Sequence, residues 1–208
     1  MSFTVINRQN WPRNAHFEHY LSLVPCQYSM TVSLDITSLV KTGRKLYPSM
    51  LYALSSVVNR HEEFRMAFND KDELGIYDRL CPSYTIFHKD TETFSTLWTT
   101  YDDDYETFLR SCKSDMARFG NVKDFEAKPQ TPVNSFPVSM IPWESFESFH
   151  LHLPRAERYF FPIFTMGKYV EREGKFLLPL AVQVHHAVCD GFHVCRLTGE
   201  LRELVACL

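Results

Sequence analysis

The sequence predicts an α/β or α+β fold: a two-layer sandwich in which a mixed β-sheet is packed with helices. Short segments rich in β-forming residues dominate the second half of the chain, and segments with helical spacing of apolar residues are spread along it. The 208 residues are 45% hydrophobic and include only seven glycines, with no internal repeat. A second domain on a flexible tether is therefore not expected, and we predict one domain over residues 1–208.

The first half is expected to alternate helices with strands. Residues 13–21 read as a short helix, and residues 28–36 alternate weakly and favour a strand. A helix over residues 46–61 has Pro48 near its start and places its apolar residues on one face. A hairpin near residues 69–78 is expected next, followed by strands at 84–88 and 94–98.

The clearest helix lies at residues 103–119, where Tyr105, Phe108, Leu109 and Cys112 begin an i, i+3, i+4, i+7 pattern. The second half is otherwise strand-rich. After a polar, proline-containing loop at 121–135, strands are expected near 136–141, 146–153 and 161–170, then a long strand at 175–186 and a last helix at 192–205.

Composition excludes some classes of function. The net charge of −3 and the absence of a basic stripe argue against a nucleic-acid binder. No apolar run reaches the ~18–20 residues of a membrane span, and the first residues do not resemble a secretory leader. The six cysteines form no C-x-x-C pair, so we expect reduced thiols in a cytoplasmic protein. The 17 Phe and 10 Tyr suggest interfaces or an aromatic-lined pocket.

Ionisable residues gather in VQVHHAVCDGFHV, at residues 182–194. If a strand runs to about Val184, His185 and His186 lie at its end and point to opposite faces. Gly191 allows a tight turn after them. A histidine here could act as a general base. Asp190 could shape the site, and if buried it would need a cationic partner.

Three other interpretations remain for this stretch. A histidine in an apolar run is most often a core residue satisfied by a backbone carbonyl. A zinc site from His185, His186, Cys189 and His193 has suitable ligands, but adjacent strand histidines point apart, so we expect no metal. A Cys189 nucleophile is disfavoured because neighbouring Asp190 would raise its pKa.

HHAVCDGFH resembles the active-site signature of the chloramphenicol acetyltransferase family. Members of this family are trimeric, coenzyme A-dependent acyltransferases. Further segments resemble that family in the same order along the chain, from about Asn10 to about Leu204: NWPRNAHFEHY, LDIT, KLYP, FRMAF, YTIFH, TETFSTLW, IPWESFESF and FPIFTMGKY. H-x-x-x-D-G alone is less specific, because dihydrolipoyl acyltransferase cores share it. The resemblance implies the coenzyme A-dependent acyltransferase fold.

The resemblance also implies a mechanism. His186, held by its own backbone carbonyl, would remove the proton from the 3-hydroxyl of chloramphenicol, and the oxygen would attack the thioester of acetyl-CoA directly. Ser139 would donate to the oxyanion. Asp190 would pair with Arg13 as an architectural ion pair. Acetyl-CoA would be a cosubstrate, with no permanently bound cofactor, and the activity would give antibiotic resistance.

Less specific positions follow from the same resemblance. They are Tyr20, Cys26, Leu151 and Ile163 for the chloramphenicol pocket, Thr165 for a water near the oxyanion, and Lys45, Tyr47, Lys168 and Tyr169 for coenzyme A. The family implies a homotrimer in which His186 of one subunit faces a pocket built mostly by its neighbour. Two departures are a shorter segment before KLYP and Pro137 close to Ser139. An acetyltransferase for another alcohol or amine, and a non-catalytic antibiotic-binding protein, are the alternatives.

Overall fold

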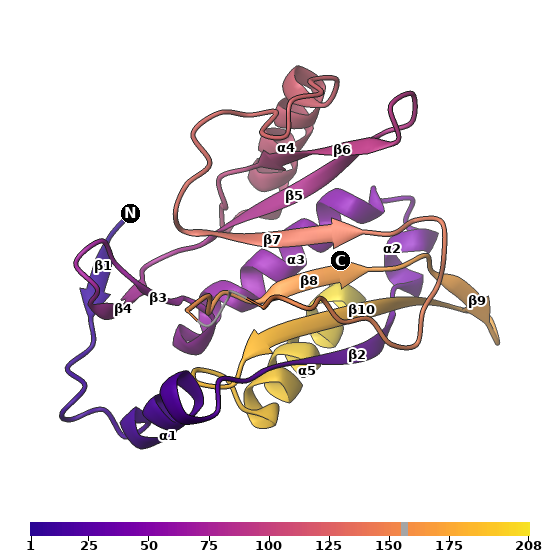
Figure 1. Cartoon of the computed structure of the whole chain (residues 1–208). Helices are drawn as coiled ribbons and strands as arrows, with labels where there is room; N and C mark the ends of the chain where they lie inside the picture. The colour runs from indigo at the N-terminus through magenta and orange to yellow at the C-terminus, as the bar shows by residue number, and fades with distance from the viewer. Residues whose placement is uncertain (155–157) are drawn as a thin grey trace.

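A mixed seven-stranded sheet forms the centre of the computed structural model, which describes residues 1–154 and 158–208 (Figure 1). The strand order is β2–β10–β8–β7–β5–β6, and β9 pairs with the first residues of β10. β7 is parallel to β5 and β8, and the other pairs are antiparallel, which confirms the predicted mixed sheet. The strands are β2 (Gln27–Asp35), β5 (Cys81–His88), β6 (Thr93–Trp98), β7 (Ser135–Met140), β8 (Ile163–Met166), β9 (Val170–Arg172) and β10 (Lys175–His185).

Helices cover one face of this sheet (Figure 1). They are α2 (Thr37–Lys41), α3 (Leu46–Arg60), α4 (Tyr105–Phe119) and α5 (Gly191–Cys207). Every residue of α3 from Pro48 to Val58 is buried, because this helix lies between α4, α5 and the sheet. The N-terminus of α4 is capped by Asp104, whose carboxylate accepts a hydrogen bond from the Thr107 N–H.

Two stretches of the first half of the chain, residues 3–23 and 62–77, form smaller elements beside the main sheet. β1 (Phe3–Val5), β4 (Leu74–Tyr77) and β3 (Met66–Phe68) make a three-stranded antiparallel sheet, preceded by the short helix η2 (Glu62–Phe64). This sheet contains the predicted hairpin. The helix predicted at 13–21 is instead a short α1 (Asn14–Glu18) that continues as a π-helical turn, η1 (His19–Leu23).

The two faces of the sheet differ in chemistry. On β10, Leu178, Leu180, Val182 and Val184 belong to the buried core beneath the helices. The alternate residues point to the other face. Register extends this second face across the sheet, because directly opposed residues share a side: Gln183 opposes Ser29 and Ile163, Ala181 opposes Thr31 and Thr165, and Thr165 in turn neighbours Ser139. We call it the polar face, defined by Gln27, Ser29, Thr31, Ser139, Ile163, Thr165, Ala181, Gln183 and His185.

The strand predicted at 146–153 is wrong. This segment crosses the polar face without regular structure, and side chains satisfy its backbone: the Phe149 N–H donates to Thr31 Oγ1 at 3.3 Å, and the Leu151 N–H donates to Gln183 Oε1 at 2.9 Å. The strand predicted at 161–170 is split into β8 and β9. Gly167 lies at the break, where a Cβ atom would come within 2.7 Å of the Pro179 side chain.

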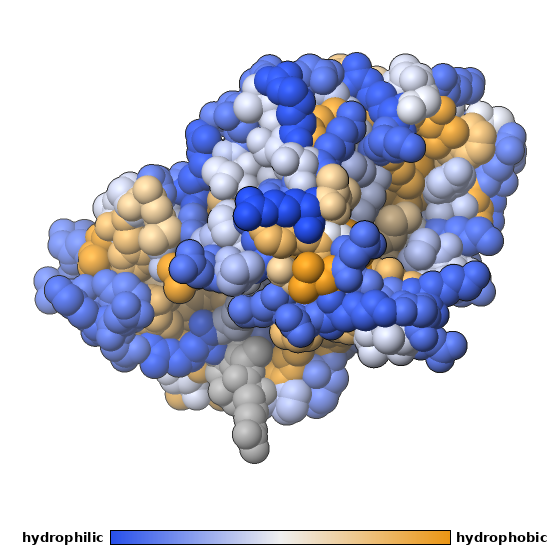
Figure 2. Space-filling model, turned by 90° about the horizontal axis from the view of Figure 1, so that it is seen from above, coloured by the Kyte–Doolittle hydropathy of each residue, from blue (hydrophilic) through white to orange (hydrophobic). Residues whose placement is uncertain are grey.

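The surface mixes polar and apolar residues. Hydrophilic residues cover most of the face seen in Figure 2, and hydrophobic residues appear on it in separate patches. Within residues 1–154 and 158–208, no helix is long and apolar enough to cross a membrane.

Candidate active site

His186 begins the turn that joins β10 to α5. Its backbone N–H donates to the Cys26 carbonyl at 2.9 Å, just before β2 begins. The turn then closes on itself, since the N–H groups of Val188 and Cys189 both donate to the His185 carbonyl, at 3.2 and 3.0 Å. Position 186 is therefore anchored at the end of the sheet, where its side chain can leave the core.

A single guanidinium fixes this turn. Arg13 donates to both carboxylate oxygens of Asp190, at 2.6 and 2.7 Å, and also to the carbonyls of His186 at 2.9 Å and Ala187 at 2.8 Å. The hydrogen bonds from Arg13 hold the pKa of Asp190 below its ordinary value, although partial burial raises it. Arg13 immediately precedes α1, so the pair joins two parts of the chain that are 177 positions apart.

Two phenol rings hold the His186 imidazole. Tyr20 stacks on it with ring centroids 3.9 Å apart and an interplanar angle of 8°, and Tyr28 meets it edge-on at 5.4 Å. Its Nδ1 lies 3.3 Å from Asp190 Oδ1, but outside hydrogen-bonding geometry. The predicted hydrogen bond from this ring to the backbone carbonyl of His186 is not formed, since that nitrogen has no hydrogen-bond partner among the described residues and the carbonyl accepts from Arg13. The side chain remains 28% exposed. The imidazole is thus restrained on its faces while part of it stays accessible.

The neighbouring histidines have different surroundings. His185 is 1% exposed, its Nδ1 accepts a hydrogen bond from the Ala187 N–H at 3.1 Å, and its ring lies edge-on to Phe160. His193 accepts from the Asp190 N–H through Nδ1 at 2.9 Å, which requires this nitrogen to be unprotonated. Burial lowers the pKa of His193, more than the nearby Glu63 raises it, and this agrees with a neutral ring.

Cys189 is fully buried, and burial raises the pKa of its thiol well above the ordinary value. A thiolate is therefore disfavoured at this position, and with it a cysteine nucleophile. Among the residues that the structure describes, no group of three or more His, Cys, Asp or Glu side chains is arranged to hold a metal ion.

Ser139 lies on a different part of the sheet. It is half-buried on β7 and neighbours Thr165 of β8, which opposes Ala181 of β10. Ala181 precedes His186 by five positions, so strand geometry separates Ser139 from His186 by about 19 Å, from a rise of ~3.3 Å per residue and a strand spacing of ~4.8 Å. One chain does not bring these two side chains together.

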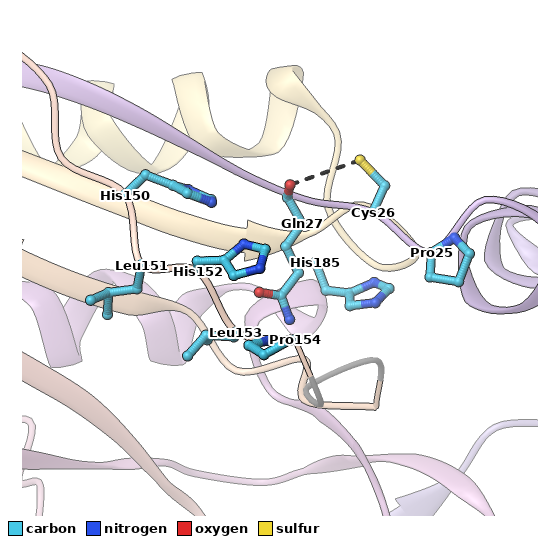
Figure 3. Close-up of a pocket in the computed structure, with 9 residues that line it drawn as sticks. All are labelled: Pro25, Cys26, Gln27, His150, Leu151, His152, Leu153, Pro154 and His185. Atoms are coloured by element: carbon cyan, nitrogen blue, oxygen red, sulfur yellow. Dashed lines mark hydrogen bonds between the residues drawn. The ribbon is translucent and has the colours of Figure 1, made fainter.

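A cavity of about 280 Å³ opens at the end of the sheet that bears the histidines (Figure 3). Cys26 and Gln27 contribute from one side, His185 from the end of β10, and the irregular segment from the other side. His152, from the irregular segment, also lines the cavity. Cys26 and Leu151, both predicted pocket residues, line this cavity, whereas Tyr20 contacts His186 instead, and Ile163 and Thr165 lie on the polar face.

The residues predicted to contact coenzyme A lie mostly at the opposite end of the sheet, near the start of α3 and the β8–β9 connection (Figure 1). Lys45, Lys168 and Tyr169 are exposed there. Tyr47 differs, because its hydroxyl donates inward to the carbonyls of Thr85 at 3.1 Å and Val138 at 3.4 Å, and burial raises its pKa. That hydroxyl ties α3 to β5 and β7, and it is not available to a ligand.

Sequence reasoning missed several residues around the cavity. His150 and His152 were read as part of a strand, and Gln183 was not singled out. A signal for Gln183 exists, since it is the one uncharged polar side chain in the apolar run between Lys175 and His185. A buried carboxamide in such a strand must find partners.

Comparison with known proteins assigns the chain to a family. A profile of the chloramphenicol acetyltransferase family matches residues 1–202. A chloramphenicol acetyltransferase of Clostridium perfringens is 55% identical over 205 residues, and one of Campylobacter coli is 52% identical; each alignment covers 99% of both chains.

Solved structures share the fold at lower identity. A chloramphenicol acetyltransferase superposes with a TM-score of 0.85 at 20% identity, covering 98% of this chain and 100% of the other. A dihydrolipoamide acetyltransferase of Azotobacter vinelandii gives 0.68 at 17% identity, covering 92% and 86%. Since the family profile spans residues 1–202 and relatives above half identity align almost end to end, the chain belongs to the chloramphenicol acetyltransferase family.

Proposed function

We propose that this protein transfers the acetyl group of acetyl-CoA to the 3-hydroxyl of chloramphenicol and so gives resistance to the antibiotic. Membership of the family supports this reaction. The observation that carries it is the His186 imidazole, which is stacked on Tyr20, set on a turn fixed by Arg13 and Asp190, and partly exposed. A restrained and accessible imidazole is what general-base catalysis requires.

The proposed chemistry uses one base and no covalent enzyme intermediate. With the ring proton on Nδ1, the Nε2 lone pair of His186 is left for the substrate, and Asp190 serves through its ion pair with Arg13, which fixes the turn. Nε2 takes the hydroxyl proton as the oxygen attacks the thioester carbonyl. The tetrahedral intermediate then expels coenzyme A, whose sulfur receives that proton. Ser139 donates to the oxyanion, and Thr165 holds a water beside it.

We infer that two copies of the chain build each active site. About 19 Å between Ser139 and His186 within one chain is too far for both to contact one tetrahedral centre, which needs groups within about 3 Å. At the end of η1, Leu23 is also 77% exposed and Val24, which follows the helix, is 51% exposed, close to Cys26 in sequence, as expected at a subunit interface. A homotrimer with sites between neighbouring subunits meets both requirements.

Mixing two inactive variants tests this arrangement. Refolding His186→Ala together with Ser139→Ala in equal amounts should restore activity, since about a quarter of the interfaces in a ring of mixed subunits combine an intact His186 with an intact Ser139. Each variant alone is the control. Oligomers that mix fully and show no recovered turnover would exclude a site shared between copies.

The remaining assignments complete the site. Tyr20, Cys26, Leu151 and Ile163 are proposed to contact chloramphenicol. Lys45 and Lys168 are proposed to bind the phosphates of coenzyme A, and Tyr169 its adenine or pantetheine. We further propose that residues 1–208 act as one domain in the cytoplasm, where the six cysteines, all unpaired with one another in the structure, stay reduced.

A thiol-release assay with purified protein, acetyl-CoA and chloramphenicol tests the function. Release that depends on chloramphenicol is expected. Release only with another alcohol or amine would support an acetyltransferase of different specificity. Chloramphenicol binding without release under any acceptor would contradict an enzymatic role.

A further inference from the structure

A buried carboxamide lies near the C-terminal end of β10, two residues before His185. Gln183 is 4% exposed, and its chain neighbours Val182 and Val184 are both core residues. Burying an amide without partners costs a few kcal/mol, so its hydrogen bonds should reveal why it is there.

Gln183 bonds to the backbone of a single residue through both ends of its amide. Its Oε1 accepts from the Leu151 N–H at 2.9 Å, and its Nε2 donates to the Leu151 carbonyl at 3.0 Å. Nε2 also donates to Gln27 Oε1 at 3.1 Å. The side chain therefore presents the donor and acceptor that a neighbouring strand would offer. Because the amide of Gln183 takes the place of a neighbouring strand, the chain at Leu151 crosses the sheet with both its N–H and its carbonyl hydrogen-bonded.

The clamped residue belongs to the wall of the cavity. His150, Leu151, His152 and Leu153 line it in succession, facing Cys26 (Figure 3). These residues lie in no strand or helix, so no ladder of backbone hydrogen bonds fixes them. Other side-chain contacts on the segment are longer or at the surface: Thr31 Oγ1 accepts from the Phe149 N–H at 3.3 Å, and Ser29 Oγ lies 3.0 Å from Nδ1 of the exposed His150 ring.

We propose that Gln183 is a positioning residue for acceptor binding: it holds the wall formed by His150–Leu153 at the distance from Cys26 that the acceptor alcohol requires. Gln183 does not line the cavity and acts through Leu151. The inference depends on the proposed function, because it takes this cavity as part of the chloramphenicol site.

Gln183→Met tests the role, since methionine keeps the length of the side chain and removes both bonds to Leu151. The KM for chloramphenicol should rise about tenfold or more as the two peptide groups seek water and the wall shifts. The KM for acetyl-CoA and the value of kcat should change by less than about threefold, because His186 is untouched. Gln183→Glu keeps an acceptor for the Leu151 N–H but sets a carboxylate oxygen against the Leu151 carbonyl and Gln27 Oε1, so it should raise the KM for chloramphenicol as well.

The chain offers a matched control in Asn59. Its carboxamide clamps Leu80 in the same way: the Leu80 N–H donates to Asn59 Oδ1 at 2.8 Å, and Asn59 Nδ2 donates to the Leu80 carbonyl at 2.9 Å. Asn59 lies on α3 and lines none of the cavity. Asn59→Leu should lower the Tm, as Gln183→Met does, but leave the KM for chloramphenicol unchanged.

Equal KM changes in both variants, or a lower Tm with unchanged KM in Gln183→Met, would overturn the inference and leave a structural role. Calorimetric titration of the wild type and both variants with chloramphenicol gives their Kd values, and so compares the variants without turnover. Wild-type protein that binds chloramphenicol but does not acetylate it would contradict the proposed function alone, and the Kd values of the variants would then decide the role of Gln183.

Discussion

The turn that bears His186 and the strand that bears Ser139 are built in different ways. The turn has little regular backbone pairing, and Arg13 supplies four hydrogen bonds to hold it. Ser139 lies on β7 between two parallel neighbours, β5 and β8, so the sheet itself sets its position. A side chain that must project from the end of a sheet needs a dedicated tether, whereas one on a central strand takes its place from register.

This contrast predicts different responses to mutation. Changes around the turn should alter both the position of His186 and the stability of the fold, because the hydrogen bonds from Arg13 serve both. A change at Ser139 should affect the reaction without disturbing the fold. Substitutions at His186, Ser139, Arg13 and Asp190 probe that difference.

His186→Ala should lower kcat by at least about 10³-fold, because the base itself is removed. His185→Ala is the matched control: it removes a buried ring and should act mainly by lowering the Tm. Steady-state kinetics and thermal unfolding of both variants distinguish the two roles. Similar losses of kcat in both proteins, with folding unchanged, would reverse the assignment.

Ser139→Ala should lower kcat by about 10²–10³-fold, as expected for the loss of one oxyanion donor. The Tm should stay close to that of the wild type, since no backbone pairing of β7 is lost. Circular dichroism and differential scanning calorimetry provide the check. A large fall in Tm would mean that the Ser139 hydroxyl stabilises the fold, in contrast to the role in the reaction proposed for it.

Arg13→Lys should lower kcat by about 10²-fold and also lower the Tm. One ammonium cannot reproduce the bidentate contact with Asp190 together with the two carbonyl contacts, so the turn should shift and misplace His186. Kinetics and unfolding should change together in this variant. Loss of stability with full kcat would show that the tether does not position the base.

The smallest expected effect is on the pH dependence of stability. The pKa of Asp190 is lower in the folded protein than its ordinary value near 3.9, so its stabilising contribution is present above that value and is lost as pH falls through the folded pKa. Asp190→Asn should therefore have a lower Tm than the wild type at neutral pH, and the difference should shrink towards pH 3. A difference that grows on acidification would contradict the sign. Asp190 is 39% exposed, so solvent screening keeps the effect modest.

Much of the fold was predictable because several helices and strands show their apolar spacing within their own residues, without reference to distant partners. The helices α3, α4 and α5 and the strand β10 carry regular apolar spacing over many residues. The segment 146–153 shows why other predictions failed. Its alternation suits a strand, but the partners of its backbone are the side chains of Gln183 and Thr31, and no local pattern announces them. β1 was missed because three residues are too few to show a period.

The site was predictable only in part. The position of the histidines at the end of a strand followed from the sequence of β10 itself. The pairing of Asp190 with Arg13 came from resemblance to a family, since 177 intervening positions carry no local signal. Stacking of Tyr20 on His186 depends on the π-helical turn of η1, which propensity does not reveal.

The pairing of β2 with β10 also bears on how the protein forms during synthesis. β2 is an early strand, yet its in-register partner β10 begins 140 positions after β2 ends, at Lys175 against Asp35. Until residues 175–185 are made, the backbone groups along this edge of β2 lack their sheet partner, and contacts of such sequence separation slow folding. Co-expression of molecular chaperones that bind the nascent chain, or expression at reduced temperature, should therefore increase the yield of native protein.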